Sequence, residues 1–140
     1  MDKYEVVRKI EKFAPPETAE KWDCSGWLAE TSKRKISKIL LALTVTDDIY
    51  NQAINTGCDM IISHHPLFSV PLKYKNIDMY CAHTNMDLAS GGTTDTLIQK
   101  AAENGLPVFE ITKDDRYVRY VKTDICLTEL LKILSKISKN

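Results

Sequence analysis

The three histidines of this 140-residue chain all lie just beyond short apolar runs. The adjacent pair His64 and His65 follows one run, and His83 follows the next run along the chain. Asp87 stands four residues beyond His83. Imidazole and carboxylate groups together are typical ligands of zinc, iron or manganese. The residue types and their spacing therefore favour a site for one or two divalent transition-metal ions.

The apolar runs that must position these residues have the length of buried strands. They lie at residues 39–43, 60–62 and 79–82, and residues 47–57 between the first two have helical spacing of apolar side chains. This order of strand, helix, strand, crossover and strand predicts an α/β fold with a mostly parallel sheet flanked by helices. Ligands of such sheets bind outside the carboxyl ends of the strands. We therefore expect all three histidines at one rim of the sheet.

The rest of the chain supplies further elements and no evident boundary. Helices are predicted over residues 4–13, 95–104 and 127–137. Strands are predicted over residues 108–112 and 117–122, joined by a polar turn at residues 113–115 and able to pair antiparallel at an edge. Because no linker rich in proline and glycine divides the chain, we expect a single domain over residues 1–140.

The composition excludes several classes of protein. With 19 Lys+Arg against 19 Asp+Glu, the chain lacks the basic surface of a nucleic-acid-binding protein. A hydrophobic content of 44% argues against disorder, and no apolar run is long enough to span a membrane. The four cysteines form no C-x-x-C pair, which argues against a zinc ribbon or a redox motif. No signal-peptide segment follows Met1, so we expect reduced thiols in a cytoplasmic protein.

Some of these features also have an interpretation as ordinary packing. Adjacent histidines on a continuing strand would point to opposite faces, and only one could reach a given ion. Pro66 turns the chain, so both can serve one ion or two neighbouring ions, with Asp87 as a candidate bridge. A packed or surface position is the alternative for the histidine pair. For Trp22 and Trp27, an anchoring role in the core or at an interface is favoured over a base-stacking platform.

Six segments, taken in order, resemble the family of GTP cyclohydrolase I type-two homologues, the Nif-three-like dinuclear-metal proteins. The matching segments are IEKFAP at 10–15, WDCSG at 22–26, LALTVT at 41–46, IISHHPL at 61–67, AHTNMD at 82–87 and SGGTTD at 90–95. The double histidine combined with the His-Thr-Asn-x-Asp block is the most specific part. The resemblance extends from residue 4 to about residue 135.

The resemblance implies an α/β fold assembled into a toroidal, hexameric homo-oligomer with a two-metal site on its inner wall. It implies that His64 and His65 bind metal, that Asp87 bridges two ions, and that His83 stands close behind the ligands. It also implies a metal-dependent hydrolase that acts on a nucleotide or another phosphoester. The sequence contains no P-loop motif, and no catalytic residue is assigned.

The chain departs from the family pattern at several positions. It resembles a short member without the usual C-terminal half, whose late histidine and glutamate complete the metal site, and it has no histidine after His83. Thr44 stands in place of an aspartate and Cys24 in place of an asparagine. Three outcomes follow: one ion bound with water, ligands donated by a neighbouring subunit, or a lost site. The alternative hypothesis is a truncated, non-catalytic metal-binding or scaffold protein that acts through homo-oligomeric assembly.

Overall fold

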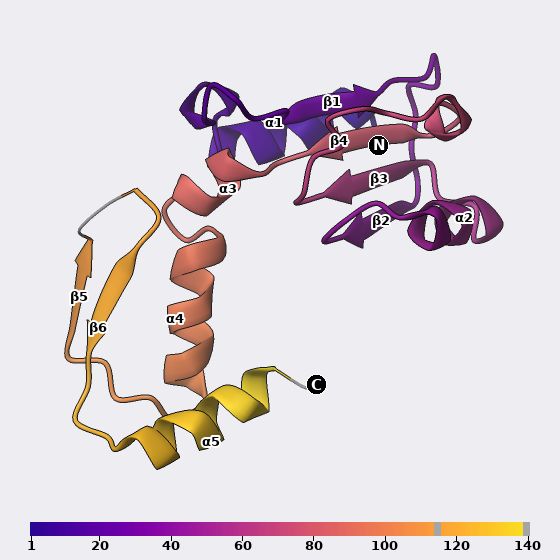
Figure 1. The fold of residues 1–140 in the computed structure, drawn as a ribbon. Helices are drawn as coiled ribbons and strands as arrows, with labels where there is room; N and C mark the ends of the chain where they lie inside the picture. Colours follow the sequence, from indigo (N-terminus) through magenta and orange to yellow (C-terminus); the bar gives the residue numbers. More distant parts are fainter. Residues whose placement is uncertain (114–115, 139–140) are drawn as a thin grey trace. The chain divides into compact units, whose positions relative to one another are not determined.

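The computed structural model describes residues 1–113 and 116–138 and contains two compact units, Met1–Ala89 and Ser90–Asn140 (Figure 1). Residues 114–115 of the predicted turn at 113–115 lie outside the described residues. The histidines all belong to the first unit.

The first unit is built on a four-stranded, mostly parallel sheet in the order β1-β4-β3-β2. Its strands are β1 (Gly26–Ala29), β2 (Ile39–Ala42), β3 (Met60–Ser63) and β4 (Asp78–Cys81). β2, β3 and β4 run parallel, and β1 pairs antiparallel with β4 at the edge. The predicted α/β class with a mostly parallel sheet is therefore confirmed.

Strand β1 is not among the strands that the sequence predicts. It begins at Gly26, after the turn at residues 21–22. It has the same length as the parallel strands, but a glycine at its start is more typical of a turn than of a strand. The addition of β1 gives the parallel strands an antiparallel neighbour on the β4 side.

Helices cover both faces of this sheet. In α1 (Lys3–Phe13), Val7 packs in a cluster that contains Met60 of β3. In α2 (Asp47–Asn55), Ala53 packs in another cluster that contains the next strand residue, Ile61. Successive side chains of a strand point to opposite faces, so the two helices lie on opposite sides of the sheet. Thr46 begins α2 as an N-cap by accepting a hydrogen bond from the N–H of Ile49.

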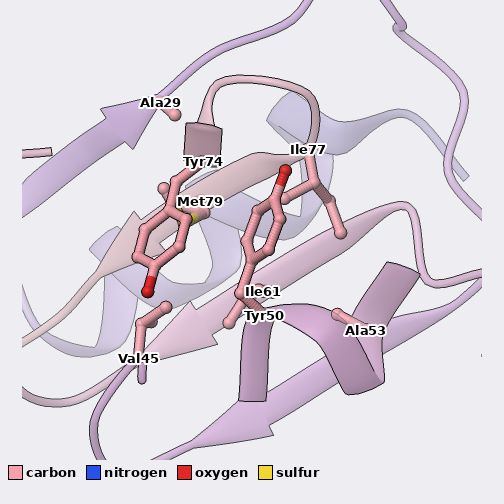
Figure 2. Packing of buried hydrophobic residues seen from close by; sticks show 8 residues of the cluster. All are labelled: Ala29, Val45, Tyr50, Ala53, Ile61, Tyr74, Ile77 and Met79. Carbon is pink, nitrogen blue, oxygen red and sulfur yellow. The ribbon is translucent and has the colours of Figure 1, made fainter. Parts of the chain in front are cut away.

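The cluster on the α2 face includes two stacked tyrosines (Figure 2). The rings of Tyr50 and Tyr74 are 4.5 Å apart between centroids and 19° from parallel. Tyr74 belongs to the 3-10 helix η2 (Leu72–Tyr74), which lies in the connection from β3 to β4. This packing attaches the connection between β3 and β4, which begins with the double histidine, to α2.

The carboxyl ends of the three parallel strands lie at one edge of the sheet. The register pairs Ala42 with Ser63 and Ser63 with Cys81. Helix α3 (Thr84–Leu88) begins shortly beyond β4, directly after His83. The polar residues that follow the three strands therefore lie next to one another at this edge, as the sequence pattern predicts.

The second unit contains α4 (Thr93–Glu103), β5 (Glu110–Lys113), β6 (Arg119–Lys122) and α5 (Leu127–Ile137). β5 and β6 pair antiparallel, as expected, and they form a two-stranded sheet of their own. Its buried core is Ala101, Leu106 and Ile133. Among the described residues, no helix has both the length and the apolar character needed to cross a membrane.

Candidate metal centre

The three histidines come together at the rim formed by the ends of β3 and β4. One ring nitrogen of each of His64, His65 and His83 lies within 4.8 Å of the others. The ring centroids are separated by 5.1 to 5.8 Å. The convergence that the strand ends predict is therefore present.

The ring of His64 is oriented by the backbone just beyond β4. Its Nδ1 lies 3.1 Å from the carbonyl oxygen of Ala82. A carbonyl oxygen only accepts hydrogen bonds, so Nδ1 carries the proton and Nε2 of the neutral ring keeps its lone pair. This Nε2 lies 3.5 Å from Oδ1 of Asp87. His64 therefore presents an unprotonated ring nitrogen next to a carboxylate.

The ring of His83 is oriented by Asp23, whose side chain is completely buried. Oδ1 of Asp23 lies 3.1 Å from Nδ1 of His83. Burial acts to raise the pKa of Asp23, but hydrogen bonds from Thr84, Ser25 and His83 outweigh it and lower the pKa to about 2. At neutral pH Asp23 is a carboxylate that accepts the Nδ1 proton, which leaves Nε2 of His83 able to bind a metal.

Asp23 is held rigidly by donors from two segments of the chain. The backbone N–H of Cys24 lies 2.7 Å from its Oδ1. The hydroxyl of Ser25 donates to Oδ2 over 2.8 Å, and the backbone N–H of Thr84 donates to Oδ2 over 3.0 Å. The Thr84 hydroxyl adds a further short bond to Oδ2. The carboxylate that orients His83 thus joins the loop before β1 to the start of α3.

His65 takes its partner from the third strand end. Its Nδ1 lies 2.7 Å from the hydroxyl oxygen of Thr44, just beyond β2. Its backbone N–H donates to the carbonyl oxygen of Leu43 over 2.8 Å. The Thr44 hydroxyl can accept or donate, so it suits either tautomer of His65. Thr44 is therefore a polar rim residue despite its departure from the family's aspartate.

The donor set fits a transition-metal ion. All three rings have Nδ1 engaged by an oxygen atom, which is the arrangement that orients metal-binding histidines in proteins. Imidazole nitrogens together with a carboxylate suit zinc, iron or manganese. Asp87 supplies that carboxylate from α3, where its side chain is 21% exposed beside His64.

The sequence predicts which histidines come together, but it does not predict which residues hydrogen-bond to them. The ring nitrogens of His64 and His65 lie together with that of His83 at the rim. Asp87 lies beside His64 but does not join this group of three. The hydrogen-bonding role of Asp23 is not among the sequence predictions. Its segment, WDCSG, enters only through the family resemblance, because the partner of its carboxylate lies 60 residues further along the chain.

Comparisons with known proteins agree on one family. Residues 1–139 match the model of the family described as Duf34/NIF3 (NGG1p interacting factor 3). A GTP cyclohydrolase 1 type 2 homolog of Clostridium perfringens is 32% identical in an alignment 111 residues long, which covers 68% of this chain and 42% of that protein. The NIF3-like protein 1 of Drosophila melanogaster is 30% identical in an alignment 156 residues long, which covers 96% of this chain and 53% of that protein.

A solved structure has the same fold over nearly all of this chain. Reduced HcgD from Methanocaldococcus jannaschii matches with a TM-score of 0.83 at 26% identity, covering 97% of this chain and 60% of that one. Across these three comparisons, the chain spans between 42% and 60% of the length of the protein it matches.

Proposed function

This chain belongs to the Duf34/NIF3 family, and on that basis we propose that it binds a divalent transition metal and hydrolyses a phosphoester or nucleotide. The observation that carries the proposal is the cluster of three imidazoles, each with Nδ1 held by an oxygen atom. Packing alone gives little reason for such a cluster, because His65 is exposed and His64 and His83 are only half-buried.

In this proposal His64 and His65 bind the metal through ring nitrogens, and Asp87 binds it or bridges two ions. The family resemblance implies that His83 stands close behind the ligands. Its short separation from the other two rings supports a place for it in the binding set as well. Zinc, iron and manganese all suit this mixture of nitrogen and oxygen donors.

A bound divalent ion would supply an activated water and would polarise the attacked phosphorus or carbon centre. The residues of the chain have separate tasks around it. Ala82 and Asp23 hold the rings of His64 and His83 in the tautomer that leaves Nε2 unprotonated. Asp87, which is partly exposed, can accept a proton from water at the site.

A nucleotide is the favoured class of small-molecule substrate. The Clostridium relative carries the name GTP cyclohydrolase 1 type 2 homolog, which supports a nucleotide without fixing the reaction. We also propose that the chain forms a cytoplasmic homo-oligomer, in which a neighbouring copy completes the coordination of the ion. Three histidines and one aspartate leave positions for water or for such outside ligands.

The second candidate function is a non-catalytic metal-binding or scaffold protein that acts through assembly. The observation in its favour is that the match covers only 42% and 53% of two relatives, so the remaining parts of those relatives are not matched by these 140 residues. A scaffold of this kind would bind metal without turnover.

Hydrolysis of a generic phosphoester with added manganese or zinc separates the two functions. The catalytic proposal predicts metal-dependent turnover that is lost in Asp87→Ala and kept in Glu103→Gln. Glu103 is a matched control because its carboxylate pairs with Lys100 on an exposed face of α4. Turnover that is equal in Asp87→Ala and wild type would exclude catalysis at this site. Bound metal without turnover would favour the scaffold function.

A further inference from the structure

Trp22 is a large aromatic residue left exposed beside the histidine cluster. Its side chain is 60% exposed, although tryptophan is usually highly buried in folded proteins. Its ring lies 6.1 Å from the ring of His83 between centroids, with the two planes at 75°. The core position expected for Trp22 is therefore wrong, and the alternative of an anchor at an interface stays a prediction.

The backbone beneath Trp22 is firmly held. The next residue is Asp23, whose buried carboxylate bonds the start of α3. The N–H of Asp23 donates to the carbonyl oxygen of Glu20 over 3.0 Å. The N–H of Glu20 in turn donates to the hydroxyl of Thr84 over 2.9 Å. The turn that carries Trp22 is thus attached to the same junction that carries His83.

The contact with His83 leaves room for a flat ligand. Two rings at 75° meet edge to face, so His83 covers at most one face of the indole. Trp27 provides the contrast, because its ring is contacted by both Tyr4 and Tyr80 at centroid distances of 5.9 and 5.5 Å. Trp27 has the partners of a packed residue, whereas Trp22 has the exposure of a binding surface.

We propose that Trp22 is the stacking wall of the ligand site and binds the planar ring of a nucleotide whose phosphate lies at the histidine cluster. This inference rests on the proposed function, because the cluster must accept the phosphate. Ligand sites commonly combine an aromatic wall with a few convergent polar groups. Stacking on an aromatic side chain tolerates any base, since every base has a π-face.

Calorimetric binding of two probes tests the proposal with metal-loaded protein. The probes are guanosine 5′-monophosphate and ribose 5-phosphate, which share a sugar phosphate and differ in the planar ring. Wild-type protein is expected to bind the nucleotide about tenfold more tightly than the sugar phosphate. Trp22→Ala should remove this preference, and Trp22→Phe should retain most of it. Trp27→Phe, the matched tryptophan control, should behave as wild type.

Two further measurements on each variant, its metal content and its oligomeric state in solution, distinguish stacking from a purely structural role of Trp22. The proposal predicts that both are unchanged by Trp22→Ala. Equal affinity of wild type for the two probes, or an intact preference in Trp22→Ala, would overturn the stacking role and leave the proposed function standing. Loss of metal in Trp22→Ala would also overturn the stacking role and would show that Trp22 supports His83. A changed oligomeric state would overturn it as well and would place Trp22 at a contact between copies. Metal-loaded protein that binds neither probe would overturn the substrate class as well.

Discussion

Oδ1 of Asp23 lies 3.1 Å from Nδ1 of His83, and this single contact joins segments 60 residues apart in the sequence. The contact provides a hydrogen-bond donor to a buried carboxylate, because a charge buried without partners would be strongly unfavourable. The same carboxylate also accepts from Ser25 and Thr84. The histidine cluster is therefore supported by the loop before β1, a strand that the sequence pattern does not reveal.

We predict that Asp23→Asn weakens metal binding by about 10- to 100-fold. The amide has the size of the carboxylate but lacks the charge that holds the Nδ1 proton of His83. Competitive titration of apo protein with zinc and a chelator measures the effect. Glu103→Gln is the control, because it makes the same kind of exchange at an exposed carboxylate of α4 that pairs with Lys100. An affinity equal to wild type in Asp23→Asn would show that Asp23 does not position His83.

A second prediction concerns pH and the segment that leads into β2. Hydrogen bonds from Lys33 and from the backbone N–H of Ser37 lower the pKa of Asp59, despite an opposing effect of burial. A lowered folded-state pKa gives stability that is complete above the unfolded-state value of about 3.9 and is lost as the pH falls below it. Asp59→Asn should cost about 1–3 kcal/mol at pH 7.

Urea unfolding between pH 7 and pH 2.5 measures this effect as the difference between wild type and Asp59→Asn. The difference should be constant at neutral pH and should shrink on acidification below about pH 4. If the difference in stability does not change with pH, the effect comes from altered packing or hydrogen bonding and not from the charge of Asp59.

The buried pair of Lys3 and Asp78 yields a prediction about stability alone. Their side chains are 1% and 0% exposed, and Nζ of Lys3 lies 3.1 Å from Oδ1 of Asp78. Lys3→Met should lower the free energy of unfolding by about 3–5 kcal/mol, because it leaves a buried carboxylate without its cation. Lys73→Met is the control, since Lys73 and Asp47 form an exposed pair whose loss should cost at most about 1 kcal/mol.

Adding Asp78→Asn to Lys3→Met separates charge from packing. The asparagine oxygen can still accept from the N–H of Thr31, which lies 2.6 Å from Oδ1 of Asp78. The double variant should therefore be more stable than Lys3→Met in urea unfolding. If it is less stable, the unpaired charge is not the cause of the loss.

The rim of the sheet is predictable from the sequence because local patterns determine it. The apolar runs before His64 and His83 are long enough to identify buried strands, and the polar residues that follow mark where those strands end. β1 and α3 are not recognisable in the same way. β1 is as long as the parallel strands, but it opens on a glycine, which is more typical of a turn than of a strand. α3 has five residues, which is too few for a helical period to emerge.

The support of the cluster could not be predicted, because it depends on contacts distant in sequence. Nothing near Asp23 indicates that its partner is His83, and nothing near Thr44 indicates His65. The exposure of Trp22 is a further case, since large aromatic residues are normally assigned to cores. These contacts can be recognised only in the folded chain, where the sheet brings the strand ends together.

The metal content of purified, untagged protein decides whether the histidine cluster is a metal centre, with His65→Ala measured alongside. Elemental analysis after incubation with zinc, iron or manganese and removal of free metal gives ions per chain. We expect at least one bound ion per chain in wild type and a clear loss in His65→Ala, with the variant still folded by circular dichroism. Wild-type protein that retains no metal from any of the three ions would contradict a metal centre at this rim.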